Sequence, residues 1–279
     1  MSQAPDYLLI GHVAHDETPQ GPKLGGTVSY AGCTANALGA HVAIVTSARK
    51  NEIVLDTLPT SIEVQLLEAP DSTVFVNTYV EGKRKQILRH RATPLTLADI
   101  PVAWRNAPII HLGPLDDEVD PDLARAFPES LVAATPQGWM RTWDAEGVVF
   151  PKKWSQAEML LPLLNVTVFS EEDIHHDTAL EAHYASLSPL LVVTRADKGC
   201  TVYRRGTDPL HVTAPQVSVL DATGAGDVFA GVFLLIFQRT GSAQQAAEAA
   251  TQLASISVSR IGLDGIPTPA EIEKVINTL

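Results

Sequence analysis

The sequence is short of positive charge. Its 279 residues include 20 Lys and Arg against 32 Asp and Glu, which gives a formal net charge of −12. General binding to nucleic acid needs a basic footprint, and an acidic chain is not attracted to anionic membranes. We therefore expect no nucleic-acid partner and no membrane. A small anionic ligand is not excluded, because a local pocket can be positive inside an acidic protein.

Cysteines and long apolar runs are also scarce. Cys33 and Cys200 are too few for a disulfide framework and lack the spacing of a zinc site. The longest apolar stretch, around 228–237, has about half the length that spans a bilayer, so we read it as a buried helix. The first residues lack the basic flank and the apolar run of a signal peptide. These absences favour a cytoplasmic protein.

Short β-branched segments alternate with segments of helical character. Strands that are apolar throughout are buried on both faces, as in a parallel sheet between helices. The expected strands lie at 7–13, 41–47, 108–113, 166–170 and 190–194, and the expected helices at 28–38, 120–127, 178–187, 242–259 and 270–278. The predicted fold class is α/β, a doubly wound and mainly parallel sheet with helices on both faces. The length alone allows one such domain or two smaller ones.

Residues 72–92 break this pattern. Polar and apolar residues alternate there, Glu81-Gly82 is a plausible turn, and basic side chains follow at Lys83, Arg84, Lys85, Arg89 and Arg91. The pattern predicts a β-hairpin with one solvated face. Such a hairpin on an α/β body is either a lid or a subunit contact, or it is an edge hairpin whose charges guard against aggregation.

Residues 219–237 carry the clearest chemical signal. Gly224 and Gly226 fall where a strand-like run gives way to a long apolar helix, and Asp227 lies in its first turn. Unpaired N–H groups at a helix start form a site for phosphate, and a carboxylate beside it is equipped to take the proton of a hydroxyl. The alternative is a glycine-rich helix start capped by Asp227. A dinucleotide-binding turn is disfavoured because Phe229 stands where Gly or Ala is needed, and no P-loop motif occurs.

Five segments resemble the ribokinase-like (PfkB) carbohydrate kinase family, in the family's order. They are GHVAHD (11–16), LGGTVSYAGCTANALGA (24–40), VTRADKG (193–199), DATGAGDVFAG (221–231) and ISVSRIGLDGIP (256–267). The resemblance covers nearly the whole chain. It implies one kinase domain over residues 1–279, with a small β lid whose elements lie around 15–26 and 72–92.

The resemblance implies roles for individual residues. Asp227 would be the general base, and the N–H groups of Gly224, Ala225 and Gly226 would form the anion hole. Substrate would be bound at Asp16, Gly25 and Gly26. The implied nucleotide-binding residues are Ser170, Thr194, Gly199, Thr223 and Ser257. Magnesium is implied by the charge of the polyphosphate.

The sequence departs from the family pattern at several of these places. Tyr30 stands where many family sugar kinases have Asn, so we expect different recognition of the substrate there. The family's N-x-x-E motif near magnesium is represented by SEED (170–173), which makes Asp173 and Glu172 the candidate metal ligands. Ala196 replaces a glycine. Asp221 falls where many relatives have a loop for a monovalent cation, and potassium is left open.

Two further segments bear on the acceptor. Residues 135–144, TPQGWMRTWD, resemble a segment that carries an Arg near the transferred phosphate, and Arg141 is the candidate; a surface salt bridge is the alternative. In the hairpin, Asn77, Tyr79 and Gln86 would line the acceptor pocket. The aromatic in GGTVSY and the hairpin resemble relatives that act on cyclic polyols such as inositol.

The sequence thus predicts transfer of the γ-phosphoryl group of ATP, with Mg²⁺, to a hydroxyl of a small sugar or cyclic polyol, with an inositol-like acceptor favoured. A nucleoside kinase of the same fold and a non-catalytic sugar or nucleotide sensor remain the alternatives. Pairing of two subunits through the lid is left open.

Overall fold

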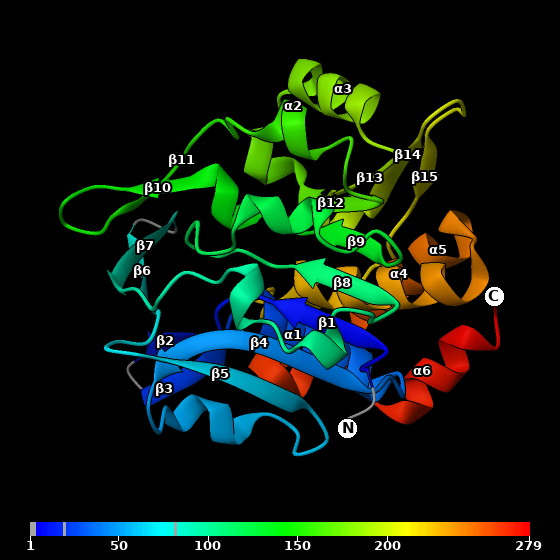
Figure 1. The fold of residues 1–279 in the computed structure, drawn as a ribbon. Helices are drawn as coiled ribbons and strands as arrows, with labels where there is room; N and C mark the ends of the chain where they lie inside the picture. The colour runs from blue at the N-terminus through cyan, green and yellow to red at the C-terminus, as the bar shows by residue number, and fades with distance from the viewer. Residues whose placement is uncertain (1–3, 19–20, 81–82) are drawn as a thin grey trace.

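A nine-stranded sheet runs through the centre of the protein (Figure 1). The computed structural model describes residues 4–18, 21–80 and 83–279. In spatial order the strands are β15 (Leu210–Val212), β14 (Cys200–Arg204), β13 (Leu190–Thr194), β12 (Val166–Ser170), β9 (Leu131–Ala134), β8 (Ile109–Leu112), β1 (Tyr7–Ile10), β4 (Val42–Arg49) and β5 (Glu63–Ala69). Neighbouring strands are parallel from β13 to β5, whereas β13–β14 and β14–β15 are antiparallel. The predicted, mainly parallel sheet is confirmed.

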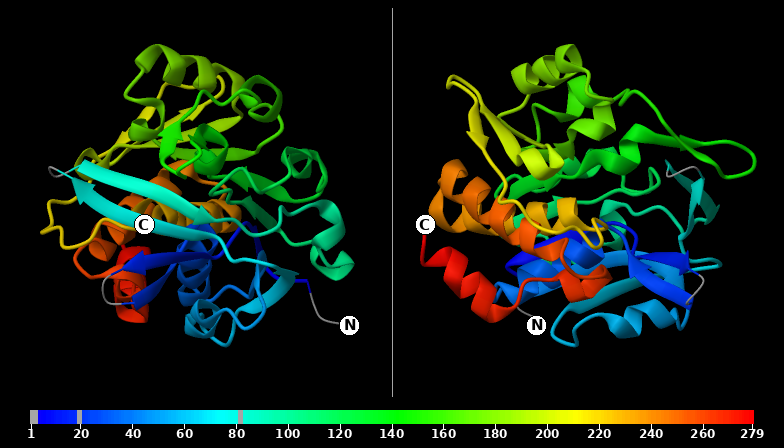
Figure 2. Two further views of the ribbon diagram at one scale, coloured as in Figure 1. Left: turned by 90° about the vertical axis from the view of Figure 1, so that its left-hand side faces the viewer. Right: turned by 180° about the vertical axis from the view of Figure 1, so that it is seen from behind.

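Helices cover both faces of this sheet, as predicted. One face, seen from behind in Figure 2, carries α1 (Thr27–Ala37), α4 (Ala225–Thr240), α5 (Ala243–Ser257) and α6 (Pro269–Ile276). They share a core with Tyr7 and Leu9. The alternate residues Leu8 and Ile10 point to the opposite face and its separate core, as the two-residue period of a strand requires.

The second face is covered by α2 (Ala157–Leu160), α3 (Thr178–Leu187) and the 3₁₀ helices η2 (Leu97–Asp99), η3 (Val102–Trp104), η4 (Pro121–Arg125), η5 (Pro136–Met140) and η6 (Glu171–Ile174). The 3₁₀ helices η1 (Ile53–Thr57) and η8 (Gly262–Gly265) pack against the core of the first face, and η7 (Ala196–Lys198) lies between β13 and β14. The helical segment expected at 120–127 is therefore 3₁₀ rather than α. Asp120 caps it by accepting from the Asp122 N–H, and Pro121 occupies its first position.

A separate four-stranded sheet stands at one end of the molecule, at the left in Figure 1. Its order is β3 (Gly21–Gly25), β2 (Ala14–Thr18), β6 (Val74–Val80) and β7 (Lys83–His90). The expected hairpin is the antiparallel pair β6–β7, and the expected turn at 81–82 lies outside the described residues. A short ribbon, β10 (Arg141–Trp143) and β11 (Val149–Pro151), approaches it, with the Leu88 N–H donating to the Gly147 carbonyl at 2.8 Å. We use the name small sheet for β3-β2-β6-β7.

A buried histidine ties the hairpin to the end of β1. His12 is fully buried. Its Nδ1 lies 2.7 Å from the Thr73 hydroxyl, and its Nε2 lies 2.9 Å from the Thr93 carbonyl. Thr73 precedes β6 and Thr93 follows β7, so one side chain holds both ends of the hairpin. His12 therefore serves the attachment of the small sheet.

The carboxylate of Glu118 completes this attachment. It is buried and accepts three backbone N–H groups, from His12 at 3.0 Å, Leu115 at 2.8 Å and Asp116 at 2.9 Å. His12, Asp116 and Glu118 are the one group of three metal-ligating side chains found in the described part of the chain. Because His12 and Glu118 already bond to backbone groups and Asp116 pairs with Arg91, we assign the group a structural role.

Glu118→Gln is expected to lower the free energy of unfolding by about 1–3 kcal/mol, because an amide offers one acceptor oxygen to three buried N–H groups. Chemical denaturation measures the change. Asp117→Asn is the matched control, since the neighbouring Asp117 carboxylate is exposed and pairs with Lys152, and the change should shift stability by less than about 1 kcal/mol. Equal stability of the two variants would contradict the assigned role.

No helix among the described residues combines the length and the apolar character needed to cross a membrane.

Candidate active site

A cavity of about 440 Å³ is lined by the small sheet, by α1 and α4 at their starts, and by the segments that follow β9, β12 and β13. Ligand crevices of open α/β sheets form at the carboxyl ends of such strands. Most of the residues singled out in the sequence meet here: Asp16, Gly26, Tyr30, Gln86, Arg141, Ser170, Glu172, Asp173, Thr194, Gly199, Thr223, Gly224, Ala225, Gly226 and Asp227. They come from segments far apart in the chain.

Four predicted residues do not line the cavity but stand behind it. Gly25 packs against Asp16, so closely that a Cβ there would lie 2.4 Å from the Asp16 carboxylate. Asn77 donates to Asp16 at 3.2 Å. Asp221 accepts the Thr223 and Gly262 N–H groups at 2.9 and 3.0 Å. Ser257 is buried, and its hydroxyl donates to the Ala254 carbonyl at 2.8 Å.

The start of α4 has the geometry of an anion site. Gly224 has a φ of +77°, which turns the chain sharply into the helix. Its carbonyl accepts from the Asp227 and Val228 N–H groups at 3.0 and 2.8 Å. The N–H groups of Gly224, Ala225 and Gly226 therefore precede the first regular helical bond, at the positive end of the helix dipole. A 16-residue helix directs this end at the cavity.

The Tyr30 ring packs against the turn at Gly224. The ring is buried, and a Cβ on Gly224 would lie 2.3 Å from the Tyr30 Cδ1 atom. Burial raises the pKa of Tyr30, and the nearby carboxylates of Asp221, Asp16 and Asp227 add to the effect. Tyr30, which stands where the family has Asn, is thus a neutral side chain that packs against Gly224 and also lines the cavity.

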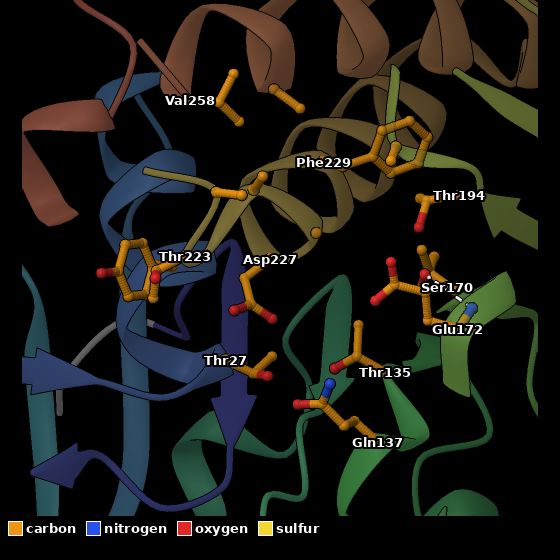
Figure 3. A pocket seen from close by; sticks show the side chains of 18 of the residues that line it. Thr27, Thr135, Gln137, Ser170, Glu172, Thr194, Thr223, Asp227, Phe229 and Val258 are labelled. Atoms are coloured by element: carbon orange, nitrogen blue, oxygen red, sulfur yellow. Dashed lines mark hydrogen bonds between the residues drawn. The ribbon is translucent and has the colours of Figure 1, made fainter. Parts of the chain in front are cut away.

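Asp227 is half-buried and points toward Thr27 (Figure 3). Burial raises its pKa to about 6, although the hydrogen bond from the Thr27 hydroxyl and the positive charge of Arg141 each lower it. A base works best when its pKa lies near the working pH. The carboxylate is therefore poised to take a proton from a hydroxyl held next to the anion site.

This assignment predicts the acid limb of the pH profile. With a pKa of about 6, Asp227 gains a proton as the pH falls through that value, and kcat/KM should drop about tenfold per pH unit below it. Thr27→Val removes the hydrogen bond that favours the charged carboxylate, so the limb should move to higher pH. Thr27→Ser keeps the hydroxyl and should keep the wild-type limb. A profile that Thr27→Val leaves in place would contradict the bond.

The acceptor end of the cavity holds a chain of polar groups on three strands of the small sheet. The Gln86 amide donates to the Asn77 oxygen at 3.1 Å, and the Asn77 amide donates to the Asp16 carboxylate at 3.2 Å. These bonds fix the Asp16 carboxylate in the cavity wall. Phe75 is buried and also lines the cavity. The Tyr79 side chain lies outside the described residues.

The opposite end of the cavity is formed by residues that follow β12. Ser170 caps η6, and the Asp173 carboxylate accepts the Ser170 N–H at 2.9 Å. The other Asp173 oxygen accepts from the Gln137 amide at 3.3 Å. Glu172 is exposed on the cavity wall beside them. The SEED segment therefore places two carboxylates at the cavity.

The carboxylates of Glu172 and Asp173 are of the type that binds magnesium. Mg²⁺ prefers hard oxygen ligands and is commonly bound by one or two carboxylates together with substrate phosphates. Glu172 and Asp173 offer such oxygens on the wall that faces the start of α4. When bound, the ion would neutralise charge on the polyphosphate.

Arg195, which the sequence reading passed over, holds this wall in place. It donates to Glu171 at 2.7 Å and to the Thr201 hydroxyl at 2.8 Å, and it pairs with Glu181. It thereby joins η6 to the turn after β13. Ala196 follows in the left-handed region with φ +49°, which explains why glycine suits that position in the family.

An apolar slot lies on the far side of Asp227 from Thr27. Its walls are Val217, Val219, Phe229, Ala254 and Val258; Figure 3 shows Phe229 and Val258 there. The sequence reading placed Ser257 at this wall instead. Ala254 and Val258 are four residues apart and lie on one side of α5, whereas the Ser257 hydroxyl donates back to the Ala254 carbonyl.

Thr27, Thr135 and Gln137 line the cavity but were not predicted. Thr27 follows the double glycine, and the other two lie in the segment already singled out for Arg141. A polar residue directly after a buried strand was the available signal. Cys33 is buried, and burial raises its pKa to about 12.

Comparison with known proteins agrees with this geometry. Residues 156–270 match the pfkB family carbohydrate kinase model. The bifunctional protein HldE of Rhodopseudomonas palustris (strain TIE-1) is 36% identical over 86 residues, which is 31% of this chain and 17% of the relative. The chain thus matches about a fifth of the length of such curated relatives.

Solved structures resemble the whole fold. A pyrophosphate-dependent kinase in the ribokinase family, complexed with a pyrophosphate analog and myo-inositol, superposes with a TM-score of 0.82 at 22% identity, covering 96% of this chain and 99% of its own. The ribokinase of Arabidopsis thaliana, complexed with ribose and ATP, has a TM-score of 0.75 at 15% identity, covering 98% and 99%.

Proposed function

We propose that this chain is a carbohydrate kinase of the ribokinase-like pfkB family and that it transfers the γ-phosphoryl group of ATP to a hydroxyl of a small cyclic polyol. The observation that carries this proposal is Asp227, a carboxylate with a raised pKa, placed in the first turn of a helix whose first residues, Ala225 and Gly226, border the same cavity. Base and anion site are the minimum equipment for phosphoryl transfer to an alcohol.

The proposed mechanism follows from this juxtaposition. Asp227 takes the proton of the attacking hydroxyl as the new O–P bond forms. The N–H groups at the start of α4 stabilise the charge on the equatorial oxygens of the phosphoryl group, and Arg141 adds a cation near the same point. The small sheet stands over the acceptor end, where closure would exclude water as a competing acceptor.

The acceptor end favours a neutral polyol. The Asp16 carboxylate, held by the Gln86–Asn77 chain, can accept hydrogen bonds from two adjacent hydroxyls. Phe75 and Leu115 supply apolar contact for the C–H face of a ring. The neighbour solved with myo-inositol has the highest TM-score among the structures compared above, which supports an inositol-like acceptor without deciding it.

The donor end favours a nucleotide. The apolar slot formed by Val217, Val219, Phe229, Ala254 and Val258 suits the flat face of a base, whereas pyrophosphate has no group to fill it. The neighbour with pyrophosphate as donor makes this the first distinction to test.

A coupled assay with ATP or pyrophosphate as donor, and with myo-inositol, ribose and nucleosides as acceptors, tests the proposal. We expect turnover with ATP and the cyclic polyol. Turnover only with pyrophosphate would refute the nucleotide donor, and turnover only with nucleosides would favour the nucleoside kinase. Binding of ligands without turnover of any acceptor would favour the sensor. Thermal shift reports that binding, because a ligand at 100 Kd adds about 2.7 kcal/mol.

A further inference from the structure

Beneath the cavity lies a buried polar chain that the proposed mechanism does not use. Tyr7 on β1 and His111 on β8 are both fully buried in the central strands. The Tyr7 hydroxyl lies 3.0 Å from the His111 Nδ1 atom, and the His111 Nε2 atom lies 3.0 Å from the Thr135 hydroxyl. Thr135 follows β9 and lines the cavity. The chain therefore runs from the middle of the sheet to the cavity floor.

The hydrogen bonds that link Tyr7, His111 and Thr135 have a preferred donor-to-acceptor direction. A phenol is a better donor than acceptor, and a buried hydroxyl hydrogen left unpaired is costly. Among the described residues, His111 Nδ1 is the polar atom placed at hydrogen-bond distance from the Tyr7 hydroxyl. Tyr7 therefore donates to Nδ1, and a neutral imidazole then carries its single hydrogen on Nε2.

Both groups stay neutral around pH 7. Burial lowers the pKa of His111 to about 3 and raises that of Tyr7 well above its usual value. The Nε2–H of His111 consequently donates to the Thr135 oxygen. That oxygen is occupied as an acceptor on the protein side, so the hydroxyl hydrogen of Thr135 is directed away from His111.

We propose that Thr135 is a ligand-binding residue whose hydroxyl donates a hydrogen bond to an oxygen of the bound ligand, and that Tyr7 and His111 are positioning residues that set this direction. The inference rests on the proposed function. Figure 3 shows the Thr135 side chain beside Gln137, between Asp227 and Ser170 in this view. The ligand oxygen belongs either to the acceptor or to the phosphoryl group of the donor.

Steady-state kinetics of the intact protein test the role of Thr135. Thr135→Val should lower kcat/KM about tenfold, the effect of one lost hydrogen bond, and Thr135→Ser should recover most of the loss. A rise confined to the KM of the acceptor assigns the bond to an acceptor oxygen. A fall in kcat or a rise in the KM of ATP assigns it to a phosphoryl oxygen.

Tyr7→Phe tests the direction set by the chain. Without the phenol donor, the His111 hydrogen can move to Nδ1 and the Thr135 hydroxyl can turn toward His111, so we expect a several-fold loss in the same kinetic parameter. This loss should disappear in the Thr135→Val background, because the two residues act through one bond. A structural defect of Tyr7→Phe would persist in both backgrounds.

Thr167→Val is the matched control. Thr167 is buried on β12, and its hydroxyl has no partner among the described residues, so wild-type kinetics are expected. The proposal is overturned if Thr135→Val matches wild type, or if Tyr7→Phe has the same effect in both backgrounds. If wild type turns over no acceptor, the proposed function fails separately, and the same cycle is then measured in the dissociation constants of ATP and of myo-inositol.

Discussion

Replacing Asp227 by Asn is expected to lower kcat by at least about 10²-fold, the contribution of a positioned general base. Asn keeps the volume and still accepts a hydrogen bond from Thr27, but it cannot take the proton of the attacking hydroxyl. In the proposed binding mode the nucleotide contacts the start of α4 and the apolar slot and not the Asp227 carboxylate, so its affinity should stay nearly unchanged. Turnover assays and calorimetric titration with ATP measure the two quantities.

The matched control is Asp56→Asn, which makes the same change at an exposed carboxylate in η1. It should retain wild-type kcat and the same unfolding midpoint. Asp227→Asn should also unfold normally, and it could gain stability because burial disfavours the charged form of Asp227. Wild-type turnover by Asp227→Asn would remove Asp227 from the mechanism and with it the main support for a kinase.

Gly224→Ala is expected to abolish the site by distorting it. A φ of +77° costs an L-residue about 1–2 kcal/mol. The added Cβ would in addition lie 2.3 Å from the Tyr30 ring, and forced overpacking costs typically about 1–3 kcal/mol. The protein should lose about 2–5 kcal/mol of stability and most of its turnover, as measured by denaturation and by the coupled assay.

Gly226→Ala separates folding from chemistry. The φ of Gly226 is not positive, and a Cβ there would meet nothing within 4 Å. Stability should therefore be kept, and alanine in a helix even favours it by about 0.5–1 kcal/mol. Turnover should still fall, because the methyl group occupies space beside the phosphoryl group. If Gly226→Ala lost as much stability as Gly224→Ala, the difference in packing between the two glycines, open space at Gly226 and the Tyr30 ring at Gly224, would be contradicted.

Much of the fold was readable in local patterns. Apolar runs such as 190–194 become buried parallel strands, and the alternating run 72–92 becomes a two-stranded hairpin, because burial on two faces or on one leaves different periodicities. The short elements were harder. Residues 120–127 form a 3₁₀ helix, and β10 and β11 have three residues each, too few to show a period.

The site residues also divide into those that the sequence predicted and those that only the packing decided. Asp227 and the glycines before it lie together in the sequence, so one segment predicted both base and anion site. Ser257 was placed at the cavity wall, but the face of α5 that meets the cavity is decided by packing on the sheet and presents Ala254 and Val258 instead. Gln137 joins Asp173 only because β9 and β12 are neighbours.

The sequence by itself predicted the fold class, the resemblance to a kinase family and the one segment that carries the proposed base and anion site, because these follow from local periodicity and from residues adjacent in the chain. The tertiary structure alone decided which side chains support that chemistry. Tyr30 under Gly224, Thr27 on Asp227, Arg195 behind η6, and Tyr7 and His111 beneath Thr135 all act across large sequence separations. Such contacts depend on the order of strands in the sheet, which no local pattern of residues specifies.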